Sequence, residues 1–281
     1  MNTIINDTKR IFLKKGACSH TFFYILNRDF GHLKEDEERA SDPLAGGIFQ
    51  QGYQCGMLWG CALAIGAESF RRYEDHGQAI AHAITATQHI MESFLHRAKS
   101  IECNDITNCD FTSKFGLVKY IISGKPITCF KLADHWAPEA IEAAHEGLSF
   151  ELPSMPDTLT SCASEVAKRM GASDEEMVMV AGFAGGLGLS GNACGALSTV
   201  IWMNTLAKVR AQKYKYTLSD PDMENILNTF YEATGYEMEC SKISGRCFKT
   251  IAEHSEFIKN GGCGNLLDVL ANLNRPSSRK N

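Results

Sequence analysis

The sequence predicts an all-α fold built from two tandem homologous helical bundles packed as a pseudo-dimer. Amphipathic stretches with helical spacing recur along the chain, whereas alternating β-branched strand patterns are scarce. The third observation is an internal repeat with a period of about 140 residues. A length of 281 residues suits one large domain or two ordinary ones, and either could bury a core.

Two glycine-containing loops define the register of the repeat. Ala45-Gly46-Gly47 and Cys55-Gly56-Met57-Leu58 align without a gap on Ala184-Gly185-Gly186 and Cys194-Gly195-Ala196-Leu197. Later anchors keep the same order: Cys103 matches Cys240, Cys129 matches Cys263, and Cys18 matches Cys162 more weakly. We expect a first unit at 1–152, a second at 153–275 and a disordered tail at 276–281, with the boundary at the proline-bearing stretch 152–157.

Apolar spacing and cap signals predict the helices in order. The first unit contributes Thr21 to Arg28, Gly56 to Arg72, Gln78 to Lys99, Lys114 to Ser123 and Pro138 to Gly147. The second contributes Ser161 to Met170, Asp174 to Phe183, Cys194 to Gln212, Pro221 to Ala233, Phe248 to Asn260 and Leu266 to Leu273. Residues 177–207 carry no charge, but glycines divide them into two buried helical segments, so we expect no membrane insertion.

Composition narrows the function classes. The net charge of -5 gives no electrostatic case for binding nucleic acid or an anionic membrane. The first 27 residues scatter charges through their apolar positions, so no secretory signal is visible. Eleven cysteines in 281 residues are too sparse for a small secreted disulfide scaffold. We therefore expect a cytoplasmic protein with reduced thiols.

Eight of the eleven cysteines fall into two sets of four. These are Cys18, Cys55, Cys103 and Cys129 in the first unit, and Cys162, Cys194, Cys240 and Cys263 in the second. Cys55 and Cys194 each follow a glycine-containing loop and begin a helix, where amide donors and the helix dipole favour thiolate. Four thiolates match an iron–sulfur cluster or a closed zinc site, although no C-x-x-C occurs.

We expect all eight cysteines to be cofactor-binding candidates. Six of them are the metal-ligand candidates: Cys55, Cys103, Cys129, Cys194, Cys240 and Cys263. The alternative interpretation is that the thiols are small core residues, as most free cysteines are. Cys61, Cys109 and Cys247 lack strict counterparts in the repeat and keep that interpretation.

The period, the four cysteines per unit and Cys194-Gly195-Ala196 resemble the family of redox-active proteins named for its C-GCAxxG-C-C pattern. The resemblance covers about Cys162 to Leu270 well and the first half more loosely. Of the C-G-A-x-x-G element, the second copy has Thr199 at the last glycine, and the first keeps Gly60 but has Met57 for alanine. The resemblance implies thiol or metal redox chemistry. Some relatives resembling split-Soret cytochromes carry covalent haem, but no C-x-x-C-H occurs here, so covalent haem is not expected.

Three other motifs carry less weight. Residues 186–191 satisfy G-x-G-x-x-G, but they follow a predicted helix and no acidic residue follows before Asp220, so nucleotide binding is not expected. His82, His89 and His96 recur every seven residues, about 10.5 Å apart on a helix, and are better explained as a solvated polar face than as shared metal ligands. Trp59, Trp136 and Trp202 are expected in the core or an interface.

Three functional hypotheses follow. The first is an electron-transfer protein in which four cysteines per unit hold an iron–sulfur or other metal centre. The second is a dithiol–disulfide redox protein without metal, and the third is a non-redox helical module that binds a partner. A redox partner protein is expected for the first two, and a homo-oligomer is compatible with all three.

Overall fold

The computed structural model describes residues 7–153, 155, 158–217 and 219–273. Within these ranges the regular structure is helical, and the β-type pairing consists of two isolated bridges. The all-α prediction is therefore confirmed. The predicted tail at 276–281 lies outside the described residues, as does part of the predicted boundary stretch.

The N-terminal half contains eight α-helices and one short 3-10 helix. They are α1 (Thr8–Lys15), α2 (Cys18–Phe30), α3 (Glu35–Ala40), η1 (Asp42–Leu44), α4 (Gly56–Arg72), α5 (His76–Ala98), α6 (Cys103–Thr107), α7 (Lys114–Ile122) and α8 (Lys125–Ser149). The prediction that the last helix begins at Pro138 is wrong, because this proline lies inside α8. Trp136, two residues before this proline, is buried between Phe22 and Phe94, and this packing stabilises α8 on both sides of the proline.

The C-terminal half contains seven α-helices and a second 3-10 helix. They are α9 (Cys162–Arg169), α10 (Asp174–Met179), η2 (Ala181–Phe183), α11 (Gly195–Arg210), α12 (Pro221–Thr234), α13 (Cys240–Ser244), α14 (Ile251–Lys259) and α15 (Gly264–Ala271). Ser173 begins α10 with a reciprocal capping box to Glu176, as its sequence indicates. The helices α1, α3, α6 and α13 were not predicted. The last three have only five or six residues, too few to show helical periodicity.

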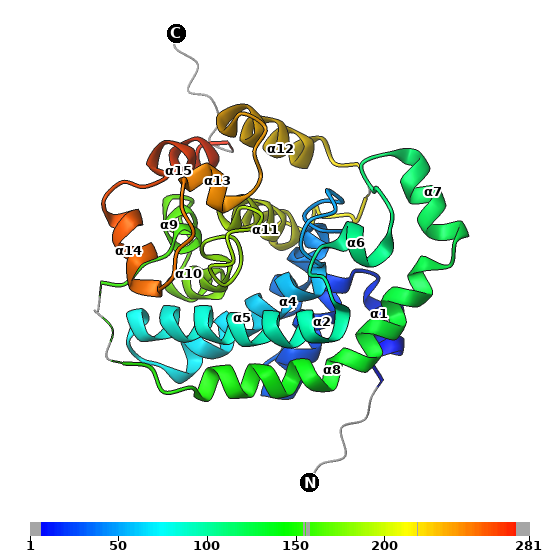
Figure 1. The fold of residues 1–281 in the computed structure, drawn as a ribbon, viewed down its shortest axis with the longest axis horizontal. Coiled ribbons are helices and arrows are strands. Elements are labelled where there is room, and N and C mark those ends of the chain that lie inside the picture. The colour runs from blue at the N-terminus through cyan, green and yellow to red at the C-terminus, as the bar shows by residue number, and fades with distance from the viewer. Residues whose placement is uncertain (1–6, 154, 156–157, 218, 274–281) are drawn as a thin grey trace.

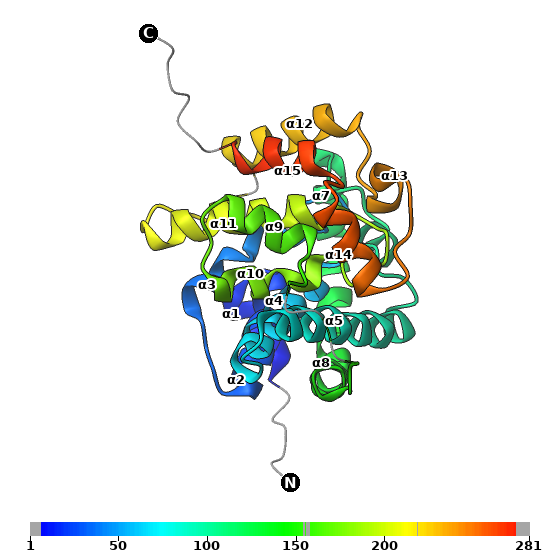
Figure 2. The ribbon, with the colours of Figure 1, turned by 90° about the vertical axis from the view of Figure 1, so that its left-hand side faces the viewer.

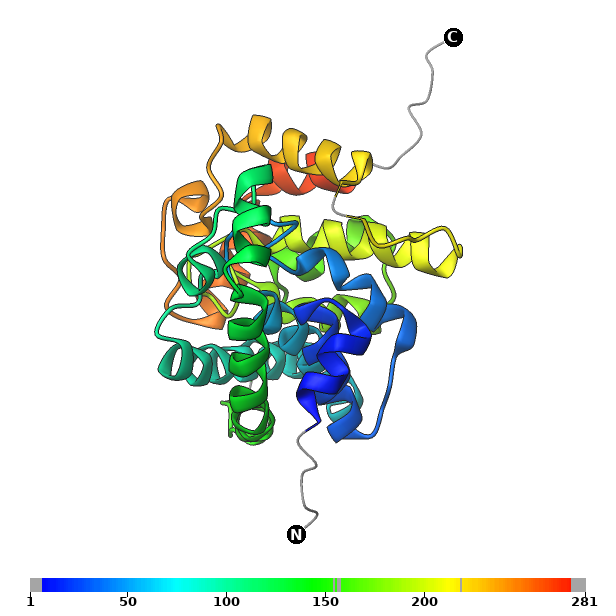
Figure 3. The same ribbon diagram turned by 90° about the vertical axis from the view of Figure 1, so that its right-hand side faces the viewer.

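The two halves lie against each other over a broad face, with α4 and α11 central. In Figure 1 the N-terminal half fills the lower and right parts and the C-terminal half the upper left. Figure 2 shows α9, α10, α14 and α15 on one side of the molecule, and Figure 3 shows α1, α2 and α8 on the other. None of the helices in the described part of the chain has the length and apolar character needed to cross a membrane.

One continuous cluster of buried apolar residues runs through both halves, from Ile11 to Ala271. At the contact, the ring of Trp59 meets Phe183 edge to face with centroids 4.8 Å apart. A β-carbon at Gly66 would lie 2.4 Å from the carbonyl oxygen of Met179, so only glycine allows α4 to approach α10 this closely. All three tryptophans are fully buried, as predicted. The division at 152/153 and the pseudo-dimer arrangement stay predictions.

Candidate functional site

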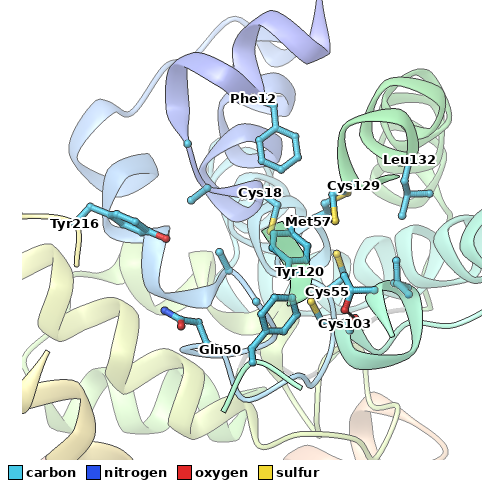
Figure 4. A pocket seen from close by; sticks show the side chains of 17 residues that line it. Phe12, Cys18, Gln50, Cys55, Met57, Cys103, Tyr120, Cys129, Leu132 and Tyr216 are labelled. Carbon is cyan, nitrogen blue, oxygen red and sulfur yellow. Dashed lines mark hydrogen bonds between the residues drawn. The ribbon is translucent and has the colours of Figure 1, made fainter. Parts of the chain in front are cut away.

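Four cysteines line one cavity of about 160 Å³ in the N-terminal half, which we call the N-terminal thiol cavity. They are Cys18, Cys55, Cys103 and Cys129, the full set that the repeat assigns to the first unit. Figure 4 shows these side chains around a shared space, with the ring of Tyr120 across it in that view. Residues separated by up to 111 positions in the sequence thus meet at one place.

Three of these cysteines begin helices. Cys18 is the first residue of α2, Cys55 is the N-cap of α4, and Cys103 is the first residue of α6. The backbone clamps the last two together, because the Cys55 N–H donates to the Ile101 carbonyl at 2.8 Å and the Cys103 N–H donates to the Tyr53 carbonyl at 2.7 Å. Each thiol therefore lies near free amide donors at the positive end of a helix.

Two glycines let α2 and α4 approach closely enough to bring the thiols together. A β-carbon at Gly56 would lie 2.6 Å from the sulfur of Cys18, and one at Gly60 would lie 2.0 Å from the carbonyl oxygen of Ser19. Real β-carbons do not make such contacts. The glycines of the first copy of the C-G-A-x-x-G element therefore serve close packing beside the thiols.

Cys18 and Cys55 form a hydrogen-bonded pair. The Cys55 thiol donates to the sulfur of Cys18, and this bond lowers the pKa of Cys18 even though burial opposes the shift. The amide groups of Gly46 and Ser19 also donate to that sulfur. The same bond, together with burial and the neighbouring negative charge, raises the pKa of Cys55 well above its usual range. Of the two thiols, Cys18 therefore ionises more readily, and Cys55 keeps its proton.

Cys103 and Cys129 complete the cavity as protonated thiols. Burial raises the pKa of Cys103 well above its usual range and that of Cys129 to about 11. The Tyr120 hydroxyl donates to the sulfur of Cys129 at 3.4 Å. Cys129 lies in the second turn of α8 and is half-buried, as is Cys18, whereas Cys55 and Cys103 are buried. Tyr120 was not predicted as a site residue, because no motif in the sequence marks this tyrosine.

The other predicted set lines a second, tighter cavity of about 20 Å³, the C-terminal thiol cavity. Its cysteines are Cys162, Cys194, Cys240 and Cys263. Cys162 and Cys240 are the first residues of α9 and α13, while Cys194 and Cys263 are the N-caps of α11 and α15. The structure therefore groups all eight predicted cysteines, four around each cavity.

The backbone around the two cavities matches in detail. The Cys194 N–H donates to the Met238 carbonyl at 3.0 Å and the Cys240 N–H donates to the Asn192 carbonyl at 2.6 Å, as Cys55 and Cys103 do in the first half. The antiparallel bridges Gln54 to Glu102 and Ala193 to Glu239 occupy equivalent places. The Gly185 amide donates to the sulfur of Cys162 as Gly46 does to Cys18. The tandem duplication itself stays a prediction.

The second cavity differs in its electrostatics. Burial raises the pKa of Cys162 to about 12 and that of Cys194 to about 11, and it raises those of Cys240 and Cys263 as well. His254 also lines this cavity, and burial lowers its pKa to about 4. Its Nδ1 atom is buried without a hydrogen-bond partner in the described part of the chain. The groups of this cavity are therefore neutral at pH 7. Sequence analysis missed His254, since the first copy offers no counterpart.

The remaining cysteines lie elsewhere or at the margin. Cys61 is fully buried in the middle of α4, and burial raises its pKa well above the usual range, which fits a core residue. Cys109 is buried. It lies close enough to Cys103 and Cys129 that a negative charge on its sulfur would raise their pKa values. Cys247 is exposed, so the prediction that it packs in the core is wrong.

The histidine series does not form one solvated face. His82 is buried and stacks on the ring of Tyr73 with centroids 3.9 Å apart, which corrects that prediction for the first of the three. His89 is half-buried and His96 is exposed. The glycine-rich stretch at 186–191 is a loop whose carbonyls accept hydrogen bonds from Gln54 and Gln88, so it helps to hold the halves together.

In the described ranges, no three His, Cys, Asp or Glu side chains converge closely enough to ligate one ion. As arranged, the cysteines of each cavity do not fit a tetrahedral mononuclear site. Binding of an iron–sulfur cluster or another thiolate-bound metal stays a prediction.

Residues 17–138 match the family model C_GCAxxG_C_C, described as "Putative redox-active protein". This segment carries all four cysteines of the N-terminal thiol cavity, so it is this cavity that is similar to the family. The match falls on the first half, where the resemblance was expected to be looser than in the second. No curated protein and no solved structure matches the chain significantly.

Proposed function

We propose that the chain is a thiol–disulfide redox protein whose reactive pair is Cys18 and Cys55. The observation that carries the proposal is the hydrogen bond from the Cys55 thiol to the Cys18 sulfur inside a cavity lined by four cysteines. Its lowered pKa and partial exposure make Cys18 the attacking sulfur. The buried, protonated Cys55 is the resolving sulfur.

The reaction takes two exchange steps. The Cys18 thiolate attacks one sulfur of a substrate disulfide, forms a mixed disulfide and releases the other substrate sulfur as a thiolate. That thiolate takes up the proton of Cys55, directly or through water. The Cys55 thiolate then attacks Cys18, forms the internal disulfide and releases the second substrate thiolate, which is protonated by solvent. The substrate gains two electrons and the cysteine pair loses two.

A single-turnover reaction with a small neutral disulfide tests this proposal. The wild-type protein should release both substrate thiols, whereas Cys55→Ala should stop at a mixed disulfide on Cys18 that mass spectrometry detects. Cys18→Ala should do neither. Cys61→Ala is the matched control, because Cys61 lies outside the cavity, and it should behave as wild type. Full turnover by Cys18→Ala would reject the proposal.

A thiolate-bound metal or iron–sulfur centre that transfers electrons is the second candidate, favoured by the grouping of four cysteines around each cavity. Iron and sulfide analysis of anaerobically purified protein, with its visible spectrum, tests it. Colourless, metal-free, folded protein would reject the metal centre. A non-redox partner-binding module remains the third hypothesis, and unchanged function after Cys194→Ser, Cys240→Ser and Cys263→Ser together would support it.

A further inference from the structure

An apolar surface lies on α7 and the start of α8, the two helices that supply Tyr120 and Cys129 to the N-terminal thiol cavity. We call it the α7 face and define it by Phe115, Val118, Ile121, Ile122 and Ile127. Phe115 is 89% exposed, Ile122 79% and Ile121 62%. This short stretch of chain holds five of the twelve exposed large apolar residues found in the described ranges. Clustered exposure of this kind marks an interaction surface more often than scattered exposure does.

The side of α7 opposite the α7 face lines the thiol cavity. Tyr120, on the same helix, lines the cavity and donates its hydroxyl hydrogen to Cys129. Among the helices, α7 packs chiefly on α8, and it lies at the outer edge of the molecule in Figure 1. A molecule seated on the α7 face would therefore lie on the outer side of the helix whose inner side walls the cavity that contains Cys18.

The charge along α7 and the start of α8 is mainly positive. Residues 111–133 contain four lysines and no Asp or Glu, with Asp110 and Asp134 at the two ends of this stretch, in a chain of net charge -5. Lys119 stands four residues from Phe115 and three from Ile122, on the same side of α7, and Lys131 stands four residues from Ile127 on α8. Both lysines are exposed. An apolar patch with a lysine rim complements an apolar surface with an acidic rim.

We propose that the α7 face docks a disulfide-bearing partner protein that presents an apolar segment flanked by Asp and Glu. This inference rests on the proposed thiol–disulfide function and names its substrate class. A second copy of the chain fits less well, because pairing two α7 faces brings lysines of both copies together. Docking on the outer side of α7 holds the partner disulfide close to the N-terminal thiol cavity, which Cys18 lines.

Two synthetic disulfide peptides with the same apolar residues test the docking, one flanked by aspartates and one by lysines. At low salt, wild-type protein should reduce the acidic peptide roughly 10-fold faster, and 0.5 M salt should remove most of this preference. Lys119→Glu with Lys131→Glu should reverse the preference. Phe115→Ser with Ile122→Ser should slow both peptides by about 5-fold, because the apolar contact is lost.

The controls separate docking from chemistry. All variants should reduce the small neutral disulfide at the wild-type rate. If the wild-type protein does not reduce this disulfide, the proposed thiol–disulfide function is wrong, whereas the docking proposal is judged by the peptide preference alone. Leu13→Ser and Lys249→Glu change an exposed apolar and an exposed basic residue elsewhere, and they should leave the peptide preference intact. Equal rates for both peptides at low salt would overturn the docking proposal. Two other results would also overturn it. One is a wild-type dimer that the double variant Phe115→Ser with Ile122→Ser dissociates, and the other is binding of the wild-type protein to anionic lipid vesicles that the same variant abolishes.

Discussion

A β-carbon built at Gly56 would lie 2.6 Å from the sulfur of Cys18. Because Gly56 begins α4 directly after Cys55, the absence of a side chain there allows the two thiols to meet. Gly56→Ala should therefore push the Cys18 sulfur away and lower the free energy of unfolding by about 1–3 kcal/mol. Urea unfolding under reducing conditions measures the loss. Gly264→Ala is the matched control at the start of a helix, since no atom lies within 4 Å of its β-carbon, and it should change stability by less than about 0.5 kcal/mol.

Cys55→Ala tests the electrostatics of the reactive pair. Loss of the Cys55 donor should raise the pKa of Cys18, because the hydrogen bond from Cys55 is the largest cause of its lowered value. At pH 7 the thiolate fraction of Cys18 falls about tenfold for each unit of this rise. Alkylation of Cys18 as a function of pH, followed by mass spectrometry, should show its midpoint moved to higher pH. An unmoved midpoint would contradict the assignment of Cys18 as the thiolate.

The buried thiols of the second cavity should make the fold less stable at alkaline pH. Burial raises the pKa of Cys162 to about 12 and that of Cys194 to about 11 in the folded state. An unfolded thiol has a pKa of about 8.5. The stability that these protonated thiols contribute is fully present below the pKa of the unfolded thiol. It is lost as the pH rises toward the pKa values of the folded state. The expected loss in this window is up to ~1.4 kcal/mol per pH unit for each thiol.

Urea midpoints at pH 7, 9 and 10 in excess reductant measure this decline. Cys162→Ser should flatten it, because serine does not ionise in this range. Cys247→Ser, at an exposed position, is the matched control and should leave the decline in place. A stability that does not change between pH 8 and pH 10 would contradict the burial of these thiols.

The continuous core predicts that both halves unfold together. Gly66→Ala places a methyl group 2.4 Å from the Met179 carbonyl oxygen at the contact between α4 and α10. It should lower the melting temperature of the whole protein in one transition, with a cost of about 1–3 kcal/mol. Calorimetry with near-ultraviolet and far-ultraviolet circular dichroism checks this. Two separate transitions would show that the halves are independent domains.

Much of the fold could be predicted because the long helices carry strong apolar periodicity. Gly56 to Arg72 was predicted with the bounds that α4 has. The start of α8 could not be predicted, since a proline inside a helix has the same local signal as a proline at its first turn. The helices α6 and α13 are fixed by the tertiary clamp at Cys103 and Cys240, which no window of sequence contains.

The cysteine sets could be predicted because the repeat kept their order. Which thiol ionises most readily could not be predicted. The pKa of Cys18 depends on hydrogen bonds from the Cys55 thiol and the Gly46 amide, and folding brings both groups close to it. Tyr120 and His254 were missed for the same reason: each reaches a cavity through packing of a helix that carries no cysteine-linked motif.

Disulfide mapping after mild oxidation tests the central claim most directly. One equivalent of a small disulfide oxidant, followed by alkylation and peptide mass mapping, should give a Cys18–Cys55 disulfide while Cys162, Cys194, Cys240 and Cys263 remain as alkylated thiols. A protein in which Cys18 and Cys55 both stay reduced while other cysteines pair would contradict the assignment of the reactive pair.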